Sequence, residues 1–88
     1  MALPQGTEDH RRAARLRTIK GARLALPDSD AAFSCVLRNL SEVGGMVELP
    51  STIGVPDELV LETTDGHLRR PCQVVWRTET RMGLDFTD

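Results

Sequence analysis

Six short segments in which apolar residues recur at every second position restrict the folds that this 88-residue chain can adopt. Phe33, Cys35 and Leu37 follow this pattern, and Leu59 and Leu61 repeat it further along the chain. A period of two places apolar side chains on one face of a strand, whereas a helix needs a period of about 3.6. The segments lie near residues 19–26, 33–38, 46–49, 59–63, 68–77 and 82–86. The sequence therefore predicts six β-strands and little or no helix.

Turn-forming residues separate these segments and leave room only for short connections. Residues 27–30 (Pro-Asp-Ser-Asp) predict a turn, the pair Gly44-Gly45 interrupts the pattern, and residues 50–56 form a connector. Residues 64–67 (Thr-Asp-Gly-His) predict a hairpin with a type I′ turn, because Asp-Gly accepts positive φ values. Six amphipathic strands in so short a chain fit an antiparallel β-barrel, whose closure removes exposed sheet edges.

The core must consist mainly of aliphatic side chains, because the aromatic residues are only Phe33, Trp76 and Phe86. Cys72, Val74 and Trp76 are expected to share one face of the fifth strand, which places Trp76 in the core or at the rim of the barrel. A stacking platform for a ligand is the less favoured alternative for Trp76. All three aromatic side chains are expected to be buried.

The two cysteines, Cys35 and Cys72, lie in apolar stretches without metal-type spacing. They are expected to be buried thiols in a reducing compartment, and a disulfide between them is the less favoured alternative. Residues 1–9 lack the apolar run of a signal peptide, and no stretch approaches the roughly 20 apolar residues of a membrane span. We therefore expect a cytoplasmic protein without a membrane span.

The charge is distributed unevenly along a chain whose formal net charge is −2. Six basic residues and no acidic residue lie between Arg11 and Arg23, and only one of the basic residues in the chain is a lysine. The guanidinium group of arginine suits bidentate recognition of a ligand. Codon usage is the alternative explanation for the excess of arginine over lysine, and it implies no function. Residues 1–17 show no apolar stripe, so we interpret them as a flexible basic arm before a barrel of residues 18–88.

Two short polar motifs suggest a ligand. Arg11-Arg12-Ala13-Ala14-Arg15 is an R-x-x-x-R motif, and residues 39–44 (Asn-Leu-Ser-Glu-Val-Gly) form an N-x-S-x-x-G motif at a strand end. Guanidinium groups suit phosphates and guanine edges, while an amide, a hydroxyl and a glycine suit a flat polar ligand. The alternatives are a solvated basic arm and a Ser or Asx turn into a tight glycine bend.

The two motifs occur in this order together with Val74-Val75-Trp76-Arg77 and the ending Gly83-Leu84-Asp85-Phe86, and the chain resembles a PilZ domain from about residue 10 to residue 86. This resemblance implies a six-stranded β-barrel that binds the bacterial second messenger cyclic di-GMP on its outer surface. It implies no cofactor, and a downstream protein partner of unknown identity. The ligand-binding residues that it implies are Arg11, Arg12, Arg15, Asn39, Ser41 and Gly44, with Arg12 as an auxiliary contact.

The chemistry of these residues agrees with such a ligand. Arg offers paired donors to phosphates and to guanine O6 and N7, and its plane can stack on a purine. Gly44 lacks a Cβ, so we expect the ligand to approach the backbone there. Many members of the family have Asp where this chain has Asn39, and the loss of charge predicts a lower affinity. An arm that folds over the ligand would relay its level to the partner.

Other functions fit the sequence less well. The chain has no nucleophile elbow, phosphate loop, metal cluster or paired carboxylates beside a histidine, so we do not expect an enzyme. The main alternative is a β-barrel that binds a protein and no nucleotide. A single-strand nucleic-acid binder would need surface aromatics on a basic groove, so no nucleic-acid polymer is expected as partner. Arg38, Arg77 and the pair Arg69-Arg70 are charges on strand faces. Solvated charges are the favoured interpretation, and a position at the border of the site is the alternative.

Overall fold

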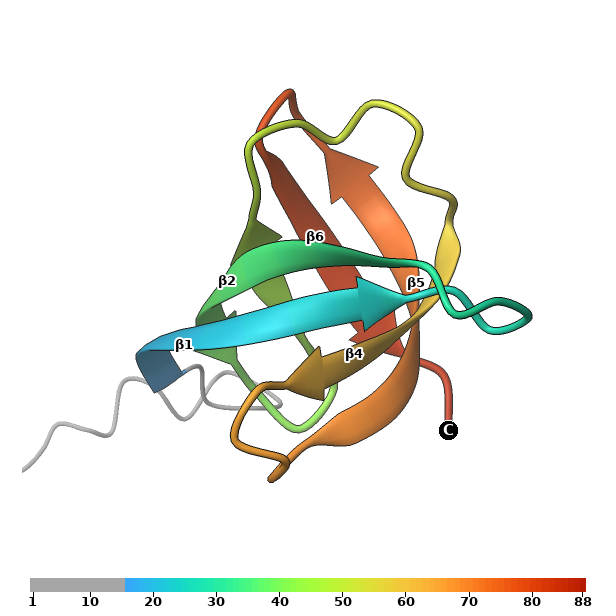
Figure 1. Cartoon of the computed structure of the whole chain (residues 1–88). Coiled ribbons are helices and arrows are strands. Elements are labelled where there is room, and N and C mark those ends of the chain that lie inside the picture. Colours follow the sequence, from blue (N-terminus) through green and yellow to red (C-terminus); the bar gives the residue numbers. More distant parts are fainter. Residues whose placement is uncertain (1–15) are drawn as a thin grey trace, which may run out of the picture.

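The computed structural model describes residues 16–88, which form an antiparallel β-barrel without a helix. The strands follow the order β1-β2-β3-β6-β5-β4 around the closed barrel (Figure 1). This arrangement confirms the predicted all-β, six-stranded fold. Because residues 16–88 contain no helix, they contain none that could cross a membrane. The strands are β1 (Leu16–Ala25), β2 (Ala32–Leu40), β3 (Gly44–Glu48), β4 (Glu58–Thr63), β5 (Arg69–Arg77) and β6 (Arg81–Phe86).

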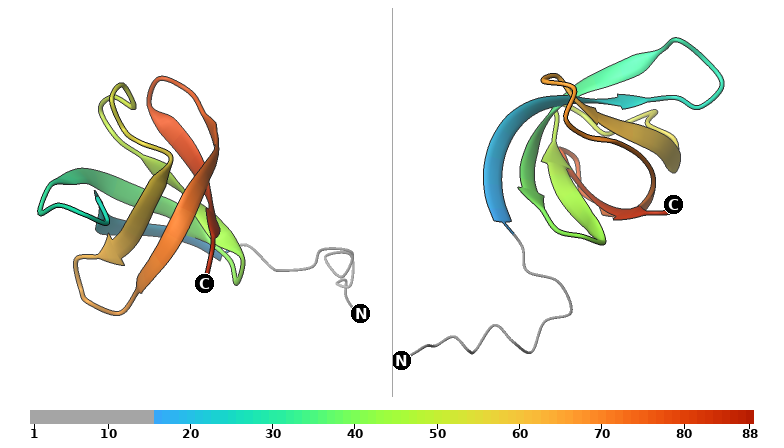
Figure 2. Two further views of the ribbon diagram at one scale, coloured as in Figure 1. Left: turned by 90° about the vertical axis from the view of Figure 1, so that its right-hand side faces the viewer. Right: turned by 90° about the horizontal axis from the view of Figure 1, so that it is seen from below.

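Aliphatic side chains from all six strands fill the barrel. Leu24, Leu37 and Leu61 are completely buried, and each such side chain contributes about 1.5–3 kcal/mol to folding. The aromatic residues Phe33 and Phe86 are only partly buried and pack against this core from its margins. The β1–β2 hairpin extends beyond the barrel, and its 26–31 loop projects from the rest of the molecule (Figure 2).

Both cysteines are buried and free. Burial raises the pKa of Cys35 to about 12, with a smaller contribution from Cys72, and burial raises the pKa of Cys72 to about 11. Each thiol is therefore neutral and serves as a small apolar side chain, as the surrounding sequence suggests.

The hairpin between β4 and β5 forms where the sequence predicts it, but the type I′ turn is wrong. Thr63 and Leu68 close a four-residue loop through the bond from Thr63 N to Leu68 O, which measures 3.0 Å. Gly66, with a φ of 80°, donates to the carbonyl of Thr63, so one residue of the loop uses the left-handed conformation. The Asp65 carboxylate accepts hydrogen bonds from the Thr63 hydroxyl and from the His67 amide, which stabilises the longer loop.

Two further expectations need correction. Gly44 and Gly45 do not interrupt the strand pattern but begin β3, where they pair with Asp85 and Leu84 of β6. Ile19 lies in the first strand as expected, yet its side chain is 75% exposed. The register of β1 shifts next to it, between Arg17 and Lys20, so this part of the strand leaves the regular alternation.

Candidate ligand-binding site

One row of cross-strand neighbours runs over the outer face of the barrel. Arg17 of β1 pairs with Asn39 of β2, and Asn39 pairs with Met46 of β3. The row continues to Gly83 of β6 and ends at Trp76 of β5. Paired residues project to the same side of a sheet, and the residues that flank Gly83 along β6 are buried. These five positions, called the outer row below, therefore face away from the core.

The predicted orientation of Trp76, on the same strand face as Cys72 and Val74, is wrong. The β5–β6 register shifts between Val74 and Trp76, so the tryptophan no longer shares the face of Cys72 and Val74. Its side chain is 46% exposed and lies over Gly83, where an added Cβ would overlap the indole ring. Trp76 thus covers the glycine from outside and leaves about half of its surface to solvent.

A hollow of about 520 Å³ opens at the Arg17 end of the outer row. This volume lies in the range of small-molecule sites, which measure roughly 300–1,000 Å³. It is lined by Arg17, Thr18, Ile19, Arg38, Asn39, Met46 and Arg81. Among the described residues, three arginines thus line the same hollow as Asn39, and this basic hollow suits an anionic ligand with hydrogen-bonding edges.

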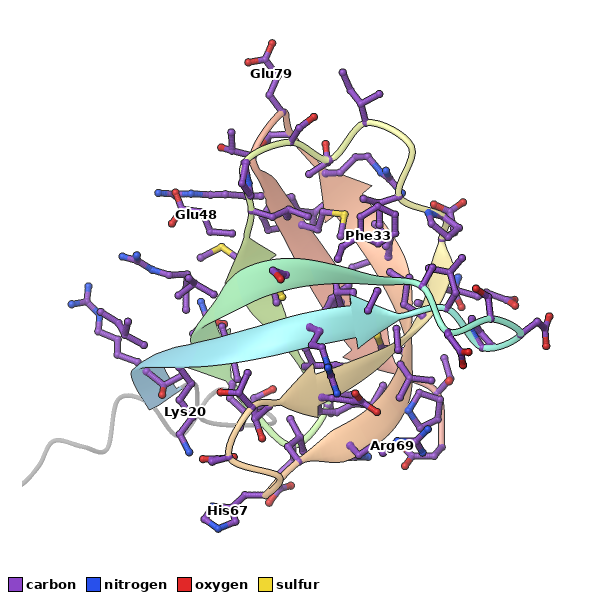
Figure 3. All side chains as sticks on the ribbon, viewed as in Figure 1. Lys20, Phe33, Glu48, His67, Arg69 and Glu79 are labelled. Atoms are coloured by element: carbon purple, nitrogen blue, oxygen red, sulfur yellow. The ribbon has the colours of Figure 1, made fainter. Side chains whose placement is uncertain are left out.

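Glu48 of β3 lies beside the basic hollow and moderates its charge. Its carboxylate is 3.3 Å from Arg38 Nη1 and 3.9 Å from Arg81 Nε. Figure 3 shows Glu48 pointing outward on the side of the barrel where β1 begins. The two arginines keep roughly half of their surface exposed in these pairs, so they stay accessible to a ligand anion.

The turn after β2 carries the second motif and is held by its own serine. The amide of Ser41 donates to the Gly44 carbonyl at 2.8 Å, and the Ser41 hydroxyl lies 3.3 Å from the same oxygen. The hydroxyl also accepts a hydrogen bond from the Val43 amide at 3.2 Å. The structural interpretation of this motif as a Ser turn is thus correct, and the hydroxyl retains one lone pair for a ligand.

Gly44 is required by the barrel itself. An added Cβ would overlap the carbonyl oxygen of Leu84 and would lie 3.1 Å from the Cα of Asp85. The missing side chain therefore allows β3 and β6 to approach each other, which is a different reason from the ligand approach expected from the sequence. A small hollow of about 60 Å³ lies between this turn and Trp76.

The structure brings only part of the predicted site together. Asn39 lines the basic hollow, while Ser41 and Gly44 lie at the small hollow beside it. Arg11, Arg12 and Arg15 lie outside the described residues. Covalent geometry nevertheless limits the distance from Arg15 to Arg17, two residues later, to about 7 Å between Cα atoms.

Sequence reasoning missed most of the cations that line the basic hollow. Arg38 is interpreted mainly as a solvated charge, with the border of the site as the alternative, while Arg17 and Arg81 are not singled out. Arg17 belongs to the basic run after Arg11, which was the available signal, whereas only the register of β6 against β3 brings Arg81 here. Arg77 lies on a strand face as expected, and its guanidinium donates to the Thr52 carbonyl at 3.0 Å and pairs with the Asp57 carboxylate at 2.9 Å.

Comparisons with known proteins identify the family and the fold. A family model described as PilZ domain matches residues 9–88. No curated protein matches the chain. Among solved structures, the chain is similar to the PilZ domain with c-di-GMP of YcgR from Escherichia coli, with 16% sequence identity and a TM-score of 0.67. The match covers 89% of this chain and 78% of that chain, and at this identity it shows a common fold.

Proposed function

The chain belongs to the PilZ domain family, and from this membership we propose that it is a receptor that binds cyclic di-GMP in the basic hollow. The observation that supports this proposal most directly is the pairing of Arg17 with Asn39. This pairing places the second motif beside the point where the R-x-x-x-R segment joins the barrel. This proximity supports the proposal that the two motifs, separated by more than twenty residues in the sequence, contact the same ligand.

The ligand's chemistry matches the residues of the hollow. Cyclic di-GMP carries two phosphates and two guanine bases, and each base offers O6 and N7 as neighbouring acceptors. Arg17, Arg38 and Arg81 supply donors for these groups, and Arg11 and Arg15 would add phosphate, guanine and stacking contacts from the arm.

Asn39 and Ser41 would recognise the polar edge of a guanine. The Asn39 side chain makes no hydrogen bond with residues 16–88, so its amide is available as donor and acceptor. The hydroxyl of Ser41 has an unused lone pair, which can accept a hydrogen bond from the base. Gly44 would contribute through the close packing of β3 on β6 and the shape of the turn.

The relay would use the basic arm. Binding would fix Arg11 and Arg15 against the ligand, and the ordered arm would present a new surface to a protein partner. Arg15 is the key residue of this relay, because its position just before Arg17 keeps it within reach of the hollow whatever path the earlier residues take.

Calorimetric titration with cyclic di-GMP tests the proposal, with GMP and cyclic di-AMP as control ligands. Arg15→Ala is expected to weaken binding by about 2–4 kcal/mol, the scale for truncating one partner of a desolvated charged contact. Arg69→Ala is the matched control, because Arg69 pairs with Glu62 away from the hollow. Trp76, at the end of the outer row, gives an independent fluorescence readout. No binding by the parent, or equal binding by the Arg15 variant, would refute the proposal.

A second candidate function is a protein-interaction module that binds no nucleotide. The supporting observation is a group of exposed apolar side chains, Val43, Val75 and Trp76, around the small hollow. Such neighbouring apolar groups are typical of protein contacts. The same titration separates the two functions, because this module would give no heat with cyclic di-GMP.

A further inference from the structure

Arg70 of β5 connects three parts of the chain that are far apart in sequence. Its Nη1 donates to the carbonyl of Glu42, in the turn after β2, at 3.5 Å. Its Nε and Nη2 donate to the Asp88 carboxylate at 3.0 Å and 2.8 Å. Its guanidinium also lies 4.0 Å from the centre of the Phe86 ring. One planar group therefore contacts the turn, the last strand and the residue that ends the described chain.

A backbone hydrogen bond from β6 also stabilises the turn after β2. The amide of Phe86 donates to the carbonyl of Val43 at 2.8 Å, next to the carbonyl that Arg70 contacts. The following carbonyl, that of Gly44, accepts from Ser41. Every carbonyl from Glu42 to Gly44 thus has a donor, and Arg70 stabilises both the turn and the phenylalanine whose amide supports it.

We propose that Arg70 is a positioning residue for the N-x-S-x-x-G turn, which fixes the orientation in which Ser41 meets the ligand. This inference rests on the function proposed above. An exposed ion pair such as Arg70–Asp88 adds little to folding stability, so its effect on the geometry of the turn is the more important one. This role requires a planar guanidinium, because one group contacts the Glu42 carbonyl, the Asp88 carboxylate and the Phe86 ring at the same time. A lysine ammonium lacks that planar shape.

The neighbouring Arg69 provides a matched control. Its Nε lies 2.7 Å from Glu62, so it is also an arginine of β5 in an ion pair with a carboxylate. Figure 3 labels Arg69 on this strand, and its hydrogen bonds within the described chain do not involve the turn after β2. Arg69→Gln and Arg70→Gln remove the same charge, so a difference between them reports the contact with the turn.

The experiment measures two properties of the full chain and of the variants Arg70→Gln, Arg70→Lys and Arg69→Gln. The first is affinity for cyclic di-GMP by calorimetry, and the second is hydrogen exchange of the Ser41 and Phe86 amides without ligand. Both Arg70 variants are expected to weaken binding about fivefold to tenfold, the scale of one lost hydrogen-bonded support, and to accelerate exchange of both amides. Arg69→Gln is expected to change neither property.

Equal affinity and equal exchange in Arg70→Gln and Arg69→Gln would overturn the role of Arg70 while leaving the receptor function intact. A parent that binds no cyclic di-GMP would instead refute the receptor function and the positioning role together. If Arg70→Gln fails to fold, Asp88→Asn provides the test instead. It removes the carboxylate that pairs with the Arg70 guanidinium and leaves the sequence of β5 unchanged. That variant is expected to accelerate exchange of the Ser41 amide, and an unchanged rate would count against the proposal.

Discussion

Replacing Gly44 with alanine should destabilise the barrel rather than act only on ligand binding. The added Cβ would overlap the carbonyl oxygen of Leu84, and its distance to the Leu84 carbonyl carbon would be 3.0 Å. Both atoms belong to the backbone of β6, which cannot move aside as a flexible side chain can. The variant must therefore separate β3 from β6 at the point where the second motif enters the sheet.

The cost of Gly44→Ala follows from this separation. Overpacking a closely packed site costs about 1–3 kcal/mol, and each backbone hydrogen bond lost between β3 and β6 adds about 0.5–1.5 kcal/mol. We expect a total of about 2–4 kcal/mol. A chain of this length has a free energy of unfolding of about 4–13 kcal/mol, so the substitution removes a substantial part of it.

Urea unfolding of the parent, Gly44→Ala and Gly21→Ala measures this cost. A Cβ at Gly21 would approach Thr64 Oγ1 to 3.1 Å. That side chain can rotate away and loses only an exposed hydrogen bond of 3.2 Å to the Gly21 carbonyl. Gly21→Ala should therefore stay within about 1 kcal/mol of the parent, since alanine also lowers the entropy cost of a glycine in a strand. If Gly44→Ala unfolds like the parent but no longer binds cyclic di-GMP, Gly44 faces the ligand and the packing argument is refuted.

Three further outcomes can be measured. The hydrogen bond from Lys20, followed by other bonds, holds the pKa of Asp65 well below its ordinary value. Its stabilising effect is present above about pH 4 and lost as the pH falls, so the urea midpoints of Asp65→Asn and the parent should differ at neutral pH and converge in acid. Cys35 and Cys72, whose pKa values are raised, should react slowly with iodoacetamide at about pH 8 until urea unfolds the chain; rapid reaction would show that they are accessible. Asn39→Asp should bind cyclic di-GMP about fivefold more tightly, because a carboxylate accepts charge-assisted bonds from guanine N–H groups, and weaker binding would contradict this orientation of the base.

The fold could be predicted because the burial of apolar side chains, which contributes most to its stability, follows a pattern that is visible in the sequence. Leu37, Leu59 and Leu61 occupy alternate positions and are buried, and turn residues mark the ends of the strands. The loop at residues 64–67 was predicted as a hairpin but with the wrong turn, because the hydrogen bonds of the Asp65 side chain favour a longer connection. Side-chain bonds of this kind depend on geometry that residue types alone do not specify.

The site was predictable only where it coincides with local motifs. Asn39 lies in the basic hollow, and the motif resemblance identified it. Arg81 could not be found in the same way, because it reaches the hollow through the pairing of β6 with β3, two strands separated by more than thirty residues. The sequence correctly identifies the missing Cβ of Gly44 as important. The space that it leaves is occupied by the carbonyl of Leu84 in the structure.

The outer row exists because the strands depart from regular alternation. Register shifts lie directly beside Arg17, Asn39 and Trp76, in β1, β2 and β5. A bulge adds one residue to a strand and turns the following side chain to the other face of the sheet. A strict period of two, continued from buried Leu37, would point Asn39 into the barrel, and continued from Val74 it would do the same to Trp76. The period of two that identifies core residues therefore assigns Asn39 and Trp76 to the wrong face. The bulges turn these side chains outward, where they can meet a ligand.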